Sequence, residues 1–195
     1  MGPTMSTPQP TAKRVTLVGP RGCGKTAFCL RLQHAPVDPN KTPHRVDPFA
    51  LTWTVGGRSF GLAIHDTCEQ DPVVVEHDAL GNITLFCYAV DDHRSFEVAG
   101  EMFKRLNTSP VPASCYPVGM KADLRADPSR PGLVSRDEAK RFVDTYCLRN
   151  YMECSSRSAQ TDQPANVIAT VAFDAFGAST LPAGRPSDGD LFPLV

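Results

Sequence analysis

The segment GPRGCGKT at residues 19–26 constrains the fold more than any other part of this sequence. It matches the pattern G-x-x-x-x-G-K-T, follows the apolar run RVTLVG at 14–19 and overlaps the start of a helical pattern, TAFCLRL at 26–32. A strand, a glycine-rich loop and a helix in this order form a phosphate-binding loop, because backbone N–H groups and the helix N-terminus all face the anion. The alternative, an ordinary glycine-rich turn, is disfavoured by the flanking strand and helix.

The residues of this loop are predicted to bind a nucleotide and its metal ion. Lys25 is expected to reach the outer phosphates, and the Thr26 hydroxyl is expected to ligate Mg²⁺. The sequence therefore predicts a nucleotide and Mg²⁺ as ligands. The other nucleotide-binding positions expected in the loop are Gly19, Arg21, Gly22, Cys23 and Gly24.

Short apolar runs alternate with helical patterns along the chain, which predicts an α/β fold of the P-loop NTPase kind. We expect a mostly parallel six-stranded sheet with helices on both faces and one antiparallel hairpin at residues 50–65. The continuous apolar run at 83–90 is typical of a strand buried on both faces. Ser135 and Glu138 form a capping box at the start of a helix. Pro117 lies inside an expected interior strand, where its missing N–H predicts a local break.

Composition indicates one domain without a strong electrostatic field. The 195 residues, of which 41% are hydrophobic, are enough for one sizeable core, expected at 13–177 between flexible tails at 1–12 and 178–195. A net charge of −1 gives no field that would attract nucleic acid. Seven cysteines without paired spacing, and the lack of an apolar run of membrane-helix length, predict a soluble cytoplasmic protein with reduced thiols.

Three further segments follow later expected strands. HDTCEQ at 65–70 places Asp66 at a strand end, where a carboxylate can bind a magnesium ion through water, and a solvated turn aspartate is the alternative. VGMKADLR at 118–125 and YMECSSRS at 151–158 follow the next strands. In this order the motifs resemble the Ras superfamily of small GTP-binding proteins over residues 13–177. The segments GCGKT, KADLR and ECSS are most similar to the Rho branch of that superfamily.

The resemblance implies a small G-domain that binds GTP or GDP with Mg²⁺, hydrolyses GTP and acts as a switch in intracellular signalling. In the family's guanine-reading motif, Lys121 would lie along the base, and Asp123 would accept the N1 and N2 hydrogens of guanine, a donor pair that adenine lacks. Effector, exchange and activating proteins are the implied partners, through the switch regions. The other implied site residues are Ser155 and Ser156 for the nucleotide, Thr26 and Asp66 for the metal, and Gln70 for positioning the attacking water.

Several positions near the terminal phosphate depart from the family's pattern. Arg21 replaces a usual glycine, and its side chain would crowd the attacking water and a partner's arginine finger, which is worth about 10³–10⁵ in rate. Glu69 replaces the glycine whose N–H contacts the terminal phosphate, and Met120 replaces an Asn or Thr whose hydrogen bond braces the loop. The switch threonine falls at His44 by ungapped spacing, with Thr42 two residues earlier as the alternative. The site is therefore expected to bind nucleotide and to hydrolyse GTP slowly.

Two functions stay open on these residues. The first is a signalling GTPase that cycles between GTP and GDP, which Gln70 favours. The second is a hydrolysis-deficient scaffold, or pseudo-GTPase, that stays in one state and acts through protein contacts. Arg21, Glu69 and the missing switch threonine favour it, unless Arg21 and Glu69 point away from the phosphate. A nucleoside-phosphate kinase or another P-loop ATPase would leave Lys121 and Asp123 unexplained.

The chain ends give expectations about membrane attachment. No cysteine follows Cys154, so we expect no prenyl anchor. Gly2 and Ser6 fit a loose myristoylation pattern, although Pro3 beside the acceptor glycine disfavours it, and one acyl chain anchors only marginally. We expect a cytoplasmic protein that reaches a membrane only through a partner or through such acylation.

Overall fold

A six-stranded sheet organises the residues that the computed structural model describes, which are 11–38, 43, 45–55, 58–67, 83–106, 114–157 and 163–176. The strands are β1 (Thr11–Val18), β2 (Phe49–Val55), β3 (Arg58–Asp66), β4 (Ile83–Ala89), β5 (Ser114–Met120) and β6 (Met152–Glu153). Their order in the sheet is β2-β3-β1-β4-β5-β6, and every neighbouring pair is parallel except β2 with β3. The predicted mostly parallel sheet with one antiparallel pair is confirmed.

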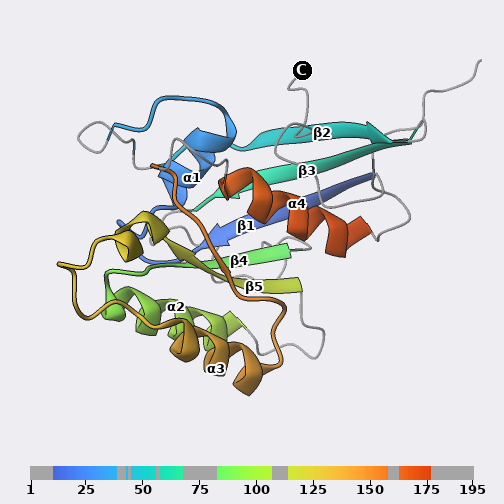
Figure 1. Ribbon diagram of the computed structural model, residues 1–195. Helices are drawn as coiled ribbons and strands as arrows, with labels where there is room; N and C mark the ends of the chain where they lie inside the picture. Colours follow the sequence, from blue (N-terminus) through green and yellow to red (C-terminus); the bar gives the residue numbers. More distant parts are fainter. Residues whose placement is uncertain are drawn as a thin grey trace, which may run out of the picture.

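Helices cover both faces of this sheet, as predicted. Figure 1 shows α1 and α4 on one face and α2 and α3 on the other. The parallel neighbours β4 and β5 are joined by a crossover through α2, and β5 and β6 by one through α3, which is the connection that parallel pairing requires. The helices are α1 (Lys25–Leu32), α2 (His93–Leu106), α3 (Arg136–Tyr146) and α4 (Gln163–Phe176), with a short 3₁₀ helix, η3 (Ala122–Ala126), after β5.

The central strand β4 divides the core into two layers. All seven of its residues are buried, which confirms the prediction from its continuous apolar run. Leu85 and Cys87 belong to the layer beneath α1 and α4, whereas Phe86 packs on the opposite face with Phe103 of α2. Because successive side chains of a strand point to opposite faces, an uninterrupted apolar run is what a strand between two helical layers needs.

The predicted capping box is present at the start of α3. The Ser135 hydroxyl accepts a hydrogen bond from the Glu138 backbone N–H at 3.1 Å, and the Glu138 carboxylate accepts one from the Ser135 backbone N–H at 2.9 Å. Two N–H groups that the helix itself cannot satisfy are thus bonded. Hydrogen bonding to Ser135 lowers the pKa of Glu138.

The expected break at Pro117 is wrong, because β5 pairs with β4 through this residue. The Gly119 carbonyl accepts a hydrogen bond from Cys154 N on the β6 side, and Pro117, two residues earlier in the strand, faces the same side. Strand β6 begins only at Met152, which lies opposite Val118. Within the described residues, the N–H that Pro117 lacks therefore faces a side of β5 without a paired strand, where proline is tolerated.

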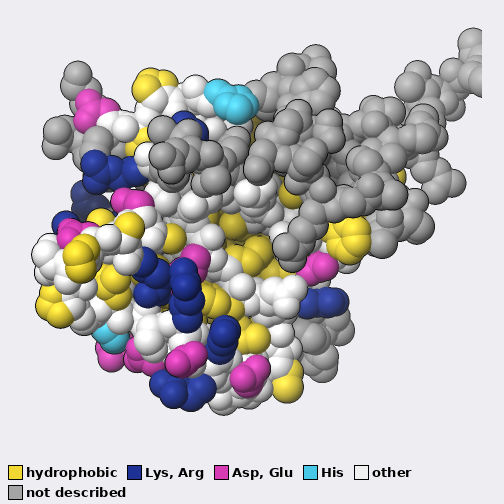
Figure 2. Space-filling model, viewed as in Figure 1, with side chains coloured by type: hydrophobic (Ala, Val, Ile, Leu, Met, Phe, Trp, Pro, Cys, Tyr) yellow, Lys and Arg dark blue, Asp and Glu magenta, His cyan; other side chains and the backbone are white. Residues whose placement is uncertain are grey.

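The ends of the described region differ slightly from expectation. Strand β1 already pairs with β3 at Thr11, three residues before the expected start of the strand. Among the described residues, no helix is long and apolar enough to cross a membrane. Six of the cysteines fall in this region and form no disulfide there. Figure 2 shows acidic and basic side chains interspersed over the lower part of the molecule, where α2 and α3 lie.

Candidate functional site

The loop between β1 and α1 has a backbone that glycine permits. Gly19 has φ 156°, and a Cβ atom there would overlap the carbonyl oxygen of Cys87 in β4. Gly24 has φ 119°, a conformation that side chains disfavour, and it directly precedes the first residue of α1. Gly19 thus lets the loop pass close to β4, and Gly24 lets the backbone turn into the first residue of α1.

Lys25 folds into this loop. Its side chain is 6% exposed, and its ammonium group donates hydrogen bonds to the carbonyl oxygens of Gly19, at 2.6 Å, and Pro20, at 3.0 Å. In the described part of the chain, no carboxylate forms a salt bridge with this ammonium. A buried charge is costly without an opposite charge, so the loop is electrostatically complementary to an anion.

Thr26 and Asp66 meet beside Lys25. The Thr26 hydroxyl donates to Asp66 Oδ2 at 2.8 Å, and the backbone N–H of Val46 donates to the same oxygen at 3.2 Å. Asp66 Oδ1 is buried and has no hydrogen-bond partner among the described residues. Burial raises the pKa of Asp66 despite the hydrogen bonds from Thr26 and Val46 and the nearby charges of Lys25 and Arg45. A hydroxyl beside an under-satisfied carboxylate is a donor set that fits Mg²⁺.

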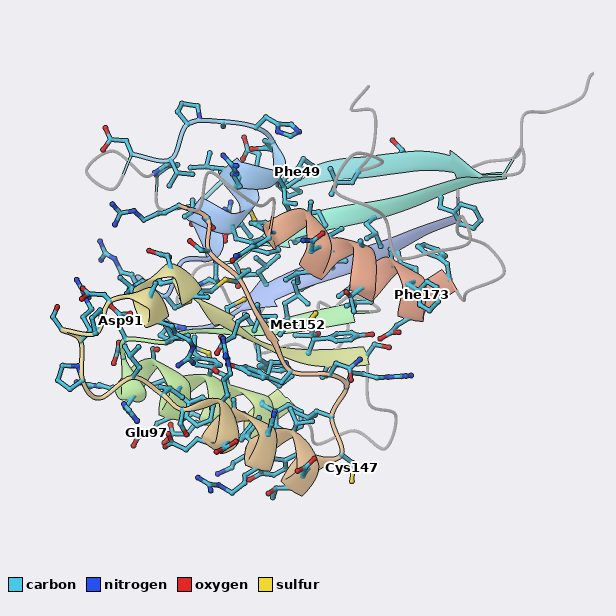
Figure 3. All side chains as sticks on the ribbon, in the orientation of Figure 1. Phe49, Asp91, Glu97, Cys147, Met152 and Phe173 are labelled. Carbon is cyan, nitrogen blue, oxygen red and sulfur yellow. The ribbon has the colours of Figure 1, made fainter. Side chains whose placement is uncertain are left out.

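The ends of β5 and β6 form a second part of the site. Asp123 accepts a hydrogen bond from the Ser155 hydroxyl at 2.6 Å through Oδ1, and its Oδ2 has no partner in the described residues. Lys121 adopts a left-handed conformation with φ 61°, and its ammonium lies 3.2 Å from Asp91 Oδ1. Figure 3 labels Asp91, which follows β4 at the same end of the sheet as η3. One carboxylate oxygen of Asp123 is therefore free to accept hydrogen bonds from a ligand.

Met120 connects the two parts of the site. Its side chain is 2% exposed, and its Cβ lies 3.2 Å from where a Cβ of Gly24 would stand. Its sulfur is 3.4 Å from the Cys154 sulfur. Met120 therefore packs against the loop and lies next to the segment that carries Lys121 and Asp123.

The predicted site residues lie along one edge of the sheet. Residues of the loop follow β1, Asp66 ends β3, and the remaining ones follow β5 and β6. Arg21 is exposed and makes no hydrogen bond or ion pair with another described residue, so its predicted effect on the attacking water stays a prediction. Outside the described residues lie Thr42, His44, Glu69 and Gln70, so their predicted roles stay predictions. The residues brought together are Gly19, Gly22, Cys23, Gly24, Lys25, Thr26, Asp66, Lys121, Asp123, Ser155 and Ser156.

Sequence reasoning missed three charged residues beside this edge, namely Asp91, Arg125 and Glu153. Arg125 and Glu153 form a largely buried ion pair, and Asp91 forms an ion pair with Lys121. Burial opposes ionisation of Glu153, but hydrogen bonds from Arg125 and Tyr151 and the charge of Arg125 lower its pKa. Their positions in the sequence could have indicated them. Asp91 follows β4, and Arg125 and Glu153 lie within the motifs KADLR and ECSS.

Comparison with known proteins gives a consistent set of similarities. The model of the Ras family matches residues 14–172. The GTP-binding protein rho2 of Schizosaccharomyces pombe is 30% identical over 166 residues, covering 76% of this chain and 80% of that protein. Human Rho-related GTP-binding protein RhoD is 28% identical over 160 residues, covering 74% of each chain. Human GTP-binding protein Rheb is 24% identical over 163 residues, covering 79% of this chain and 84% of that protein.

Proposed function

This chain belongs to the Ras family, on its Rho-like side, and from this membership and the geometry of the site we propose that it is a guanine-nucleotide-binding molecular switch. It binds GTP and GDP together with Mg²⁺, and it hydrolyses GTP slowly. Its partners are effector, exchange and activating proteins, and it acts in intracellular signalling from the cytoplasm.

One observation carries the proposal. A buried ammonium without a carboxylate partner and the carboxylate of Asp123 with one free oxygen stand at the same edge of the sheet. The first suits phosphate, and the second suits a base with two adjacent hydrogen-bond donors, which guanine has and adenine lacks. Lys25 holds the phosphates, Thr26 and Asp66 hold the magnesium ion, and the ion, when bound, neutralises phosphate charge.

We expect the buried carboxylate of Asp66 to bind the metal ion and to lower the stability of the protein when no metal is bound. Burial raises its pKa above its unfolded value, so its effect on folding becomes unfavourable as the pH rises through the folded pKa. At pH 7, Asp66→Asn should therefore raise the melting temperature of the protein without nucleotide, about 2–4 °C for each kcal/mol gained. The same change should reduce the stabilisation that Mg²⁺ and GDP together provide, which thermal unfolding with and without ligand measures.

A matched control is Asp144→Asn, because Asp144 is exposed on α3. It should leave both melting temperatures within about 2 °C of wild type, since surface substitutions are usually within about 0.5 kcal/mol. The assignment of Asp66 fails if Asp66→Asn retains the full stabilisation by Mg²⁺ and GDP.

Slow hydrolysis is the finer part of the proposal, and it depends on Arg21 and Glu69. Arg21 is exposed on the loop, and a side chain at its position stands beside the expected path of the attacking water. Glu69 adds negative charge where a flexible residue's N–H should meet the terminal phosphate. The alternative function is a hydrolysis-deficient scaffold, which would stay in one nucleotide state and act through protein contacts.

Single-turnover hydrolysis of preloaded GTP separates these two functions. The wild type should hydrolyse slowly, and the double change Arg21→Gly with Glu69→Gly should be faster, with the two single changes combining non-additively because both lie around one phosphate. A wild type without measurable turnover, but with retained nucleotide binding, would favour the scaffold. A double variant no faster than wild type would show that these two residues do not limit the rate.

A further inference from the structure

Two segments of the site are held together by three successive contacts. The first is a backbone bond from Ala122 N to Cys154 O at 3.1 Å. The second is the bond from the Ser155 hydroxyl to Asp123 described above. The third is the ion pair between Arg125 of η3 and Glu153 of β6, so the segment that carries Asp123 is joined to the β6 segment on both sides of Asp123.

The Arg125–Glu153 pair has the geometry of a rigid connection. Arg125 Nε donates to Glu153 Oε1 at 2.8 Å and to Oε2 at 2.9 Å, and Nη2 donates to Oε1 and, at 2.7 Å, to the Val134 carbonyl. The side chains are only 17% and 10% exposed. Two-point contacts of a planar guanidinium with a carboxylate fix orientation as well as distance. Arg125 therefore ties η3 both to β6 and to the segment before α3.

Glu153 has little capacity left for an external ligand. Besides Arg125, it accepts hydrogen bonds from Arg136 Nε at 3.1 Å and from the Tyr151 hydroxyl, which in turn accepts from the Tyr88 hydroxyl at 3.2 Å. On the adjacent strand, a Cβ at Gly119 would stand 3.3 Å from Glu153 Cγ. The carboxylate is thus packed and saturated with donors, in contrast to Asp123 Oδ2. Glu153 can therefore affect the site only through the residues that it contacts, such as Arg125.

We propose that Glu153, through Arg125, is a positioning residue for guanine recognition, which rests on the proposed binding of guanine nucleotides at Asp123. The pair fixes η3 relative to β6, and so fixes the Asp123 carboxylate at the angle from which it accepts both the N1 and the N2 hydrogens of the base. Discrimination of guanine from hypoxanthine, which lacks the 2-amino group, then depends on this pair. Phosphate binding at Lys25 does not depend on the Arg125–Glu153 pair.

The test compares GDP with IDP, whose base is hypoxanthine, in wild type and Glu153→Gln. The wild type should prefer GDP by about 10–100-fold, the size expected for one hydrogen bond to a charged group. In Glu153→Gln, GDP affinity should fall about 10-fold and IDP affinity much less, so the preference shrinks toward a few-fold. Competition against a fluorescent GDP analogue measures all four affinities, and thermal unfolding of each protein reports folding.

Arg125→Lys provides a second variant, because lysine keeps the charge and loses the two-point contact. It should reduce the GDP preference as well, with less loss of stability than Glu153→Gln. Arg136→Gln is the matched control: Arg136 also contacts Glu153 but is 65% exposed and lies on α3, so the preference should stay at the wild-type value.

The outcomes distinguish this inference from the proposed function. If both Glu153→Gln and Arg125→Lys retain the wild-type preference of GDP over IDP, the pair is only structural and the inference is overturned. If the wild type itself binds GDP no better than IDP and ADP, the proposed guanine recognition fails instead. A reduced preference in both variants, with an unchanged one in Arg136→Gln, supports the positioning role.

Discussion

Lys25→Met is expected to abolish useful nucleotide affinity, with a loss of roughly 100-fold or more for both GDP and GTP. Each hydrogen bond from the ammonium to a phosphate oxygen is worth about 1.5–3 kcal/mol, and two such bonds together exceed the roughly 3 kcal/mol that a 100-fold change represents. Burial strengthens these bonds, because Lys25 is only 6% exposed and its ammonium group donates to carbonyl oxygens of the loop. Titration with a fluorescent GDP analogue measures the change.

Methionine is the informative substitution because it keeps the apolar stem of Lys25, whereas Lys25→Ala also leaves a gap. Either variant leaves the carbonyl oxygens of Gly19 and Pro20 with one donor fewer, but it also removes a buried charge that has no carboxylate partner among the described residues. Because these two effects oppose each other, the protein is expected to remain folded. Lys140→Met, on the exposed surface of α3, is the matched control and should bind GDP like wild type. Unchanged affinity in a folded Lys25→Met protein would mean that the loop is an empty turn.

Asp123→Asn is expected to change the base preference of the site from guanine to xanthine. The asparagine oxygen can still accept from the Ser155 hydroxyl, while its amide N–H₂ replaces the free carboxylate oxygen and donates to the 2-oxo group of xanthine. GDP affinity should fall on the order of 10³-fold or more, because a buried polar group that loses its partner discriminates strongly between ligands. Affinity for XDP should rise correspondingly, and competition titrations with both nucleotides measure the exchange.

Asp144→Asn serves again as the control, since it makes the same chemical change on an exposed helix surface. It should leave the affinities for GDP and XDP as in wild type. An Asp123→Asn protein that keeps its GDP affinity would place guanine recognition on other residues.

Local patterns were sufficient to predict much of the fold. The apolar run of β4 and the capping box of Ser135 each depend on a few neighbouring residues, so their outcome follows from sequence alone. Pro117 was misjudged because its effect depends on which side of β5 its nitrogen faces and on where β6 begins. These are properties of the assembled sheet, and no pattern within β5 contains them.

The candidate site likewise contains residues that local motifs predict and residues that only the folded structure brings together. Lys25, Thr26 and Asp123 stand in contiguous motifs whose spacing already indicates phosphate and base recognition. The pairing of Arg125 with Glu153 joins residues that are 28 positions apart, and only the adjacency of β5 and β6 brings them together. Packing of this kind depends on the complete fold, which explains why the motifs were recognised and the residues that support them were not.

The central claim is that this site binds guanine nucleotides in preference to adenine nucleotides. Displacement of a fluorescent GDP analogue from the purified protein with Mg²⁺, by GDP, GTP, ADP and ATP, tests it most directly. GDP and GTP should compete at similar concentrations, while ADP and ATP should require concentrations on the order of 10³-fold higher or more. Competition by ATP at the same concentrations as GTP would contradict the claim.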